Sequence, residues 1–306
     1  MNALDEAILR TILYGDVFNF PMTSREIHHF LITDTPCTLQ AVENALAHSP
    51  DLPHFLEQSD GLVTVSGRLK LIPMRLQREQ DSLHLMDEAV RYGRWLARMP
   101  FIRMVGLTGA LAMHNAANAH DDIDYMLVTK AGRVWLARAF SILLVRIGKL
   151  RKVTLCPNFV LAETSLAHAP EDLYIAHEIT QLLPLSGKEI YAQMRAENGW
   201  ELSFLANAAD PFYSPEIYAP KGGWALLKRA GEWVLGGKLG DKLEAWEFRR
   251  KQAKFQYEIK RHAHNSAEIT DERVKGHFNN HGHPVMIKYF DKLRQYDLEA
   301  DLLAGD

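Results

Sequence analysis

The sequence predicts a mixed α/β protein, in which a central α/β unit lies between an N-terminal module and a mainly helical C-terminal region. Three observations predict it. Short apolar runs alternate with helical patterns over residues 101–183, helix signals precede a hairpin signal in residues 1–73, and helical periodicity dominates residues 184–306. At 306 residues the chain is long enough to bury more than one core.

The first 73 residues have the order helix, helix, helix, hairpin. Helices are predicted over "LDEAILRTILYG", "TSREIHHFLI" and "TLQAVENALAHS", and the hairpin over "HFLEQSDGLVTVSG". Thr23 and Glu26 have the spacing of a capping box, and Ser59-Asp60-Gly61 is a turn signal between two short alternating strands. This order predicts a winged-helix-like module.

The usual partner of a winged helix is duplex DNA, but the charge of this module has the wrong sign. Residues 1–70 hold nine Asp and Glu against four Lys and Arg, and the third helix, over residues 38–48, contains Glu43 and no Lys or Arg. A DNA-binding surface must neutralise phosphates, which an acidic module repels. We therefore do not expect DNA as a partner, and expect a packing, dimerising or substrate-covering role.

Residues 74–100 predict one connecting helix, because apolar side chains recur on one helical face until Pro100 ends it. The chain then alternates between strand and helix signals. Strands are predicted over "FIRMVGLTG", "IDYMLVT" and "VTLCPNFVLA", and helices over "GALAMHNAA", "AGRVWLARAFSILLVRIG" and "EDLYIAHEITQLL". Strands separated by helices indicate an α/β sheet unit.

The C-terminal region contains a basic, aromatic-rich helical segment. Residues 221–261 hold eleven Lys and Arg against five Asp and Glu. The interleaved aromatic residues are Trp224, Trp233, Trp246, Phe248, Phe255 and Tyr257. At helical spacing we expect these rings in the core and the cations on the solvated face, in preference to stacking on nucleic acid. The charge opposite to that of the N-terminal module leaves open an intramolecular contact or a homodimer.

Composition limits the class and location of the protein. Hydrophobic residues are 47%, charged residues 24% and the formal net charge −3, as in an ordinary globular chain. The N-terminal stretch has acids where a signal peptide has bases, and no apolar run approaches the roughly 20 residues that span a bilayer. Cys37 and Cys156 are far apart in the sequence and do not have the spacing of metal ligands. Two free cysteines in a reducing compartment explain them most simply. We expect a cytoplasmic protein without a membrane partner.

The stretch "TGALAMHNAANAHDDIDYMLVT" carries the candidate site. Asp122 and Asp124 are two residues apart, so on an extended chain their side chains share a face and can bridge one or two hard cations. A strand–glycine–helix turn at Gly109 precedes them, and backbone N–H groups at such a turn can hold phosphate. Carboxylates for Mg²⁺ next to amides for phosphate indicate phosphoryl or nucleotidyl transfer.

On these motifs the chain resembles the nucleotidyltransferase superfamily, which has the DNA polymerase β-like fold and includes aminoglycoside nucleotidyltransferases. The matching elements are Gly109-Ala110 after a strand, a short helix, and Asp122-Ile123-Asp124 opening the next strand, within residues 101–183. The chain is also similar to bacterial and archaeal nucleotidyltransferase-domain proteins that carry an N-terminal winged-helix-like region and "TGALAM", "DDID", "CPNF" and "AHEI" stretches. The resemblance implies an α/β (α+β) nucleotidyltransferase core.

Two positions depart from the family pattern. Ala110 replaces the serine that helps to hold the triphosphate, although Thr108 could supply a hydroxyl. The strand that usually carries the third carboxylate has Asn158 at the plausible equivalent position and no acid until Glu163. Either Glu163 reaches in as third ligand or base, or Asn158 makes a weaker metal site. His114 and Asn115, just after the turn, are further candidates to face the nucleotide.

The sequence thus predicts a nucleotidyltransferase that uses Mg²⁺ or Mn²⁺ and a nucleoside triphosphate donor. Asp122 and Asp124 are the expected metal ligands, and the acceptor, a small molecule or a protein, is not identified by the sequence. The alternative is a sensor or scaffold that binds a nucleotide without turnover and acts through a protein partner. The histidines between residues 262 and 283 match no zinc-ligand spacing.

Overall fold

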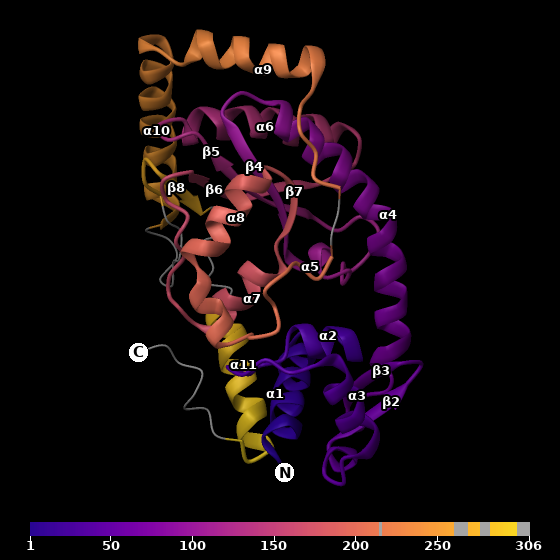
Figure 1. Cartoon of the computed structure of the whole chain (residues 1–306). Coiled ribbons are helices and arrows are strands. Elements are labelled where there is room, and N and C mark those ends of the chain that lie inside the picture. Colours follow the sequence, from indigo (N-terminus) through magenta and orange to yellow (C-terminus); the bar gives the residue numbers. More distant parts are fainter. Residues whose placement is uncertain (214–215, 260–268, 276–281, 299–306) are drawn as a thin grey trace.

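The computed structural model describes residues 1–213, 216–259, 269–275 and 282–298, with the side chains of residues 253–259 outside this description. These residues form a mixed α/β protein with two sheets. The larger sheet lies toward one end of the molecule and the smaller sheet toward the other, and α4 (Leu71–Arg98) runs between them (Figure 1). This helix confirms the predicted connecting helix and begins slightly before it.

The N-terminal module contains three helices and a small antiparallel sheet of order β1-β3-β2. Its elements are α1 (Ala3–Val17), β1 (Met22–Thr23), α2 (Ser24–His29), α3 (Leu39–His48), a 3-10 turn (Leu52–His54), β2 (Leu56–Ser59) and β3 (Leu62–Val65). The predicted capping box is present, since Thr23 accepts from the Glu26 amide and the Glu26 carboxylate accepts from the Thr23 amide at 2.8 Å. Asp60 and Gly61 have φ of 53° and 74°, as the tight hairpin turn requires.

The larger sheet has five strands in the order β7-β4-β5-β6-β8. They are β4 (Ile102–Thr108), β5 (Ile123–Thr129), β6 (Leu155–Ala162), β7 (Leu183–Ser186) and β8 (Arg273–Lys275). Only β5 and β6 pair in parallel, and the other neighbours are antiparallel. The helix α6 (Val134–Leu150) makes the parallel crossover. Since β7 and β8 come largely from beyond residue 183, this unit is wider than the predicted 101–183.

The C-terminal region is mainly helical and contributes to both ends of the molecule (Figure 1). Its helices are α8 (Lys188–Glu197), a 3-10 helix (Gly199–Ser203), α9 (Gly222–Leu235), α10 (Lys238–Ile259) and α11 (Gly282–Gln295). The last helix packs on α1, where Tyr289 meets Tyr14 edge-to-face at 5.3 Å and Lys292 pairs with Asp16 at 2.5 Å. The core of the N-terminal module therefore includes residues from the other end of the chain.

The prediction that the aromatic residues of α9 and α10 lie in the core is wrong for the tryptophans. Trp224, Trp233 and Trp246 are exposed, whereas Phe248 packs on Trp135 with ring centroids 5.2 Å apart. The side chains of Phe255 and Tyr257 lie outside the described residues. The helix α9 and the acidic N-terminal module lie at opposite ends of the molecule (Figure 1), so α9 does not neutralise that module within one chain.

No helix among the described residues is long and apolar enough to cross a bilayer. Of the histidines considered for zinc, His262, His264, His277 and His281 lie outside the described residues. His283 is exposed at the start of α11.

Candidate functional site

The antiparallel pairing of β4 with β5 brings the glycine turn to the second aspartate. Thr108, the last residue of β4, lies opposite Asp124 in the ladder, and Gly109 follows with φ +70°. A Cβ added at Gly109 would be 2.7 Å from Asp124 Oδ2. Only glycine meets both demands, because it adopts positive φ without strain and leaves room for the carboxylate. The expected neighbourhood of turn and aspartate is thus present.

The parallel neighbour β6 supplies an amide to the same carboxylate. Tyr125 pairs with Pro157 and Met126 pairs with Phe159, so Asn158 is the extra residue of a bulge. A bulge redirects a side chain relative to the regular strand. Here Asn158 Nδ2 donates a hydrogen bond to Asp124 Oδ1. Asn158 therefore lies beside Asp124. The family resemblance implies a third acid at this position.

The surroundings of Asp124 disfavour its negative charge. Burial raises the pKa of Asp124 to about 7, the hydrogen bond from Asn158 opposes this rise, and the charges of Asp122 and Glu178 add to it. Cys156, its register partner on β6, has its pKa raised to about 11 by burial and then by the two aspartates. A half-buried carboxylate held among other acids would be stabilised as an anion by a bound cation.

The three neighbouring aspartates have different roles. Asp121 organises the loop, because its carboxylate accepts from the Ala117 amide at 2.6 Å and from the Asp122 amide at 3.0 Å. Asp122 has an exposed side chain next to Asp124 in the chain. The turn-capping role that Asp commonly has at loop ends thus belongs to Asp121. Asp122 is left available for a ligand from solvent.

The fit of this site to a metal ion depends on what the substrate contributes. Over the part of the chain that the structure describes, no three His, Cys, Asp or Glu side chains converge as a metal-binding group. Mg²⁺ commonly binds one or two protein carboxylates and completes its shell with water and phosphate oxygens. Asp122 and Asp124 match the number of protein carboxylates in a site of that kind.

Glu163 does not belong to this site. It follows the end of β6, whereas Asp124 pairs with Cys156 near the beginning of that strand. At about 3.3 Å per residue the two carboxylates are about 20 Å apart along the sheet. Glu163 instead lies 3.7 Å from Arg103 Nε and accepts weakly from the Ala131 amide. Glu163 is therefore not placed as a third ligand or base beside Asp124, because a parallel strand carries it to the other end of β6.

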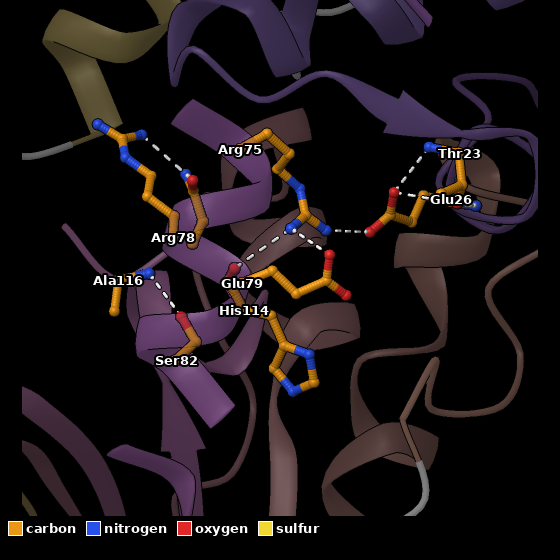
Figure 2. Close-up of polar contacts among 9 residues, drawn as sticks. Thr23, Glu26, Arg75, Arg78, Glu79, Ser82, His114 and Ala116 are labelled. Atoms are coloured by element: carbon orange, nitrogen blue, oxygen red, sulfur yellow. Dashed lines mark hydrogen bonds and ion pairs between the residues drawn. The ribbon is translucent and has the colours of Figure 1, made fainter. Parts of the chain in front are cut away.

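His114 and Asn115 contact the connecting helix, not Asp124. The Asn115 side chain accepts from Arg78 at 3.2 Å, and the His114 carbonyl lies 3.5 Å from Arg75 (Figure 2). The His114 ring stacks on Tyr213 with centroids 4.1 Å apart, and burial lowers its pKa. Their contacts attach the turn after α5 (Gly109–Ala112) to α4.

The same junction contains a buried ion pair to the N-terminal module. Arg75 donates to Glu26 at 3.0 Å, with both side chains almost fully buried, and Glu79 lies on the other side of the guanidinium (Figure 2). Ser82 accepts a hydrogen bond from the Ala116 amide one turn further along α4. The capping-box glutamate therefore has a second role, in joining the N-terminal module to the segment after the glycine turn.

Glu178 is the acidic group that the sequence pattern undervalued. It lies on α7 (Leu173–Gln181), and helical periodicity alone does not show whether this edge of the helix is covered. In the structure it is half-buried, Tyr174 hydrogen-bonds its carboxylate, and burial raises its pKa. Its charge acts on Asp124. The neighbouring His177 is a core residue that stacks on Tyr14 at 4.0 Å. The Tyr174–Glu178 spacing of four is the signal that could have identified it.

No family model, no curated protein and no solved structure matches this chain in comparisons with known proteins.

Proposed function

We propose that this protein is a metal-dependent nucleotidyltransferase that transfers a nucleoside monophosphate from a nucleoside triphosphate to an acceptor and releases pyrophosphate. The observation that carries the proposal is the approach of the Gly109 backbone to the Asp124 carboxylate, since it joins a phosphate-binding turn to a cation-binding side chain. The resemblance to a nucleotidyltransferase core with a winged-helix-like module supports it.

Each side chain has a distinct role in this proposal. Asp122 and Asp124 hold Mg²⁺ or Mn²⁺, which would neutralise charge on the phosphates. The backbone N–H groups after Gly109 bind the triphosphate, with the Thr108 hydroxyl, which does not cap α5, in place of the serine replaced by Ala110. Asn158 orients Asp124 through its amide.

We assign Glu178 as the group that accepts the acceptor's proton. Its raised pKa places it closer to neutral pH than an ordinary glutamate, which suits a general base, and Tyr174 orients its carboxylate. The charge of Glu178 acts on Asp124, which supports a position near the same aspartates. This assignment replaces that of Glu163.

The second candidate is a nucleotide-binding sensor or scaffold without turnover. Ala110 in place of serine and Asn158 in place of an acid both favour it, because each removes a group that assists phosphoryl chemistry. The buried Arg75–Glu26 pair would then transmit occupancy from the turn to the N-terminal module. Nucleotide binding without pyrophosphate release distinguishes the sensor from the enzyme.

The experiment that tests the proposal is calorimetric titration of each of the four nucleoside triphosphates, with Mg²⁺ or Mn²⁺, into the wild type and into Asp122→Asn/Asp124→Asn. Metal-dependent binding that the double variant loses would support the site and identify the donor. An assay of pyrophosphate release with candidate acceptors then separates enzyme from sensor. Absence of binding by the folded wild type would refute both candidates.

A further inference from the structure

The helix α9 is docked on the body of the protein by its polar face. Lys228 donates from Nζ to the carbonyls of Ala97 and Ile102 at 2.8 and 2.6 Å. Glu232 accepts from the Phe101 amide and from Arg103, each at 2.8 Å. Between these two residues Gly231 faces Pro100 so closely that an added Cβ would be 2.8 Å from it. The side of α9 that would normally be solvated therefore faces the protein.

The opposite side of α9 is apolar and faces solvent. We call this side the α9 apolar surface. It consists of Leu226 (65% exposed), Leu227 (64%), Trp233 (84%) and Val234 (54%). None of the residues of α9 is buried. On a helix of 3.6 residues per turn these four positions lie opposite Lys228 and Glu232. A cluster of large apolar side chains exposed together marks an interaction surface, unlike single exposed leucines.

The next helix, α10, carries further exposed side chains of the same kinds. Leu239 and Trp246 are 55% and 58% exposed, and Lys242 and Arg249 are exposed beside them. In Figure 1, α9 lies across the end of the molecule farthest from α1, and α10 runs away from it along the side. The exposed apolar side chains of α9 therefore lie at the end of the protein farthest from α1.

The acidic and basic side chains of α9 and α10 have different surroundings. The acids whose side chains the structure describes here have partners within the protein. Glu232 binds as described above, Asp241 pairs with Arg133 at 2.6 Å, and Glu244 accepts from the first amides of α6 at 2.8 Å. The buried Glu247 pairs with Arg250. The exposed cations include Lys221, Arg229, Lys238, Lys242 and Arg249. Asp241 is exposed too but is paired with Arg133, so the exposed side chains described on α9 and α10 are mainly apolar and basic.

We propose that the α9 apolar surface and its flanking cations bind the surface of an anionic lipid bilayer. Leucine and tryptophan side chains would insert between headgroups while lysine and arginine pair with lipid phosphates, which is the composition that interfacial helices use. Exposed apolar side chains flanked by exposed cations match the apolar interior and the anionic headgroups of such a bilayer. A second copy of this chain fits less well, because a twofold contact through α9 would bring the exposed cations of both copies together.

This inference does not depend on the proposed nucleotide chemistry, and it concerns attachment to a bilayer surface, not passage through it. The expectation of no membrane partner is based on the length of the apolar runs in the sequence. That length shows only whether a segment can span a bilayer. A peripheral contact of this kind would bring the end of the molecule that carries α9 to the membrane and leave the N-terminal module facing away (Figure 1).

The test is cosedimentation of the full-length protein with vesicles of phosphatidylcholine alone and of phosphatidylcholine mixed with phosphatidylglycerol. We expect binding to the anionic vesicles only, and a loss of about tenfold or more in Leu226→Ser/Trp233→Ser. Arg229→Glu/Lys238→Glu should weaken binding as well. Leu76→Ser and Arg294→Glu are matched controls, exposed at the other end of the molecule, and should bind as the wild type does.

Two results would overturn the proposal. One is no binding to anionic vesicles, or binding that Leu226→Ser/Trp233→Ser leaves unchanged while circular dichroism shows a folded protein. The other is a dimer in sedimentation velocity without lipid that the same double variant dissociates, since this would assign the surface to a second copy. Because the substituted side chains are exposed, we expect the variants to keep the wild-type unfolding temperature.

Discussion

The backbone of Gly109 lies directly against the carboxylate of Asp124, with room for a hydrogen atom and none for a methyl group. Gly109→Ala would place a Cβ 2.7 Å from Asp124 Oδ2 and force alanine into positive φ. We expect nucleotide affinity to fall at least about tenfold, because the carboxylate must move. The measurement is calorimetric titration with the triphosphate that the wild type binds.

The matched control for this variant is Gly132→Ala. Gly132 has φ +69°, almost the same as Gly109, but an added Cβ there meets nothing within 4 Å. Both variants carry the backbone strain of alanine at positive φ, of order 1 kcal/mol, and only one disturbs the aspartate. Equal losses of affinity in the two variants would show that contact with Asp124 is irrelevant.

Asp124→Asn separates function from stability. Burial raises the pKa of Asp124 to about 7 from its ordinary 3.8. The free energy of unfolding therefore falls as pH rises from about 4 to about 7, and above about pH 7 the buried charge destabilises the native state in full. Asparagine removes that charge at similar volume. We expect turnover to fall about 100-fold or more, and the free energy of unfolding to stay the same or rise by order 1 kcal/mol. Pyrophosphate release and thermal unfolding measure the two effects.

Asp60→Asn on the hairpin turn of the smaller sheet is the control, since Asp60 is exposed and the larger sheet, which carries Asp124, lies toward the other end of the molecule. It should leave turnover unchanged. A large loss of stability in Asp124→Asn would indicate that the aspartate is structural and would contradict its assignment as a ligand.

Glu178→Gln and Glu163→Gln form a matched pair that tests which glutamate serves the site. Glu178 is half-buried and its charge acts on Asp124, whereas Glu163 pairs with Arg103 beyond the other end of β6. We expect Glu178→Gln to lower kcat about 100-fold with little change in nucleotide affinity, as removal of a general base does. Glu163→Gln should retain wild-type kcat, and the reverse result would restore Glu163 to the site.

Local sequence patterns predicted the elements well because they depend on neighbours in the chain. The capping box at Thr23, the turn at Asp60-Gly61 and the strand beginning at Ile123 all follow from spacings of a few residues. The neighbourhood of Gly109 and Asp124 followed from the order of elements once β4 and β5 paired. Such features are readable from one sequence.

Features that depend on strand direction or on packing between distant segments could not be predicted from the sequence alone. Glu163 is the first acid after Asn158 in the sequence, which makes it one of two candidates for the third ligand, but a parallel strand takes the chain from one end of the sheet to the other. The burial of Glu178 is due to tertiary packing, which helical periodicity alone does not show. The tryptophans of α9 were expected inside, since periodicity identifies an apolar face without saying which way it points. In α9 the hydrogen bonds of Lys228 and Glu232 decide that direction.

Arg75→Met tests the junction between α4 and the N-terminal module. It would leave the Glu26 carboxylate buried without its cation, which typically destabilises by about 3–5 kcal/mol. The double variant Glu26→Gln/Arg75→Met should recover part of this loss, because no buried charge remains. Arg294→Met is the control: its pair with Asp291 is exposed, so we expect less than about 1 kcal/mol. Urea unfolding measures all three, and equal effects of the buried and exposed pairs would contradict this account.

His177 predicts the acid sensitivity of the fold. Burial, and then the charge of His29, lower its pKa to about 3, and its ring stacks on Tyr14 between α7 and α1. In the unfolded state the His177 side chain becomes protonated near pH 6.5, whereas in the native state it stays neutral until about pH 3. The contribution to stability is therefore complete above about pH 6.5 and is lost as pH falls toward 3, by up to about 1.4 kcal/mol per pH unit.

His177→Phe keeps a ring against Tyr14 and removes the titrating group, so its unfolding free energy should fall less steeply with acidification than that of the wild type. His84→Phe, at an exposed position of α4, should keep the wild-type slope. Urea unfolding at a series of pH values between about 7 and 4 measures the slopes. His29 and His168, whose pKa values burial lowers to about 4, keep part of the pH dependence in every variant. The prediction therefore concerns the difference of about one proton between the two variants, and equal slopes would show that His177 does not carry it.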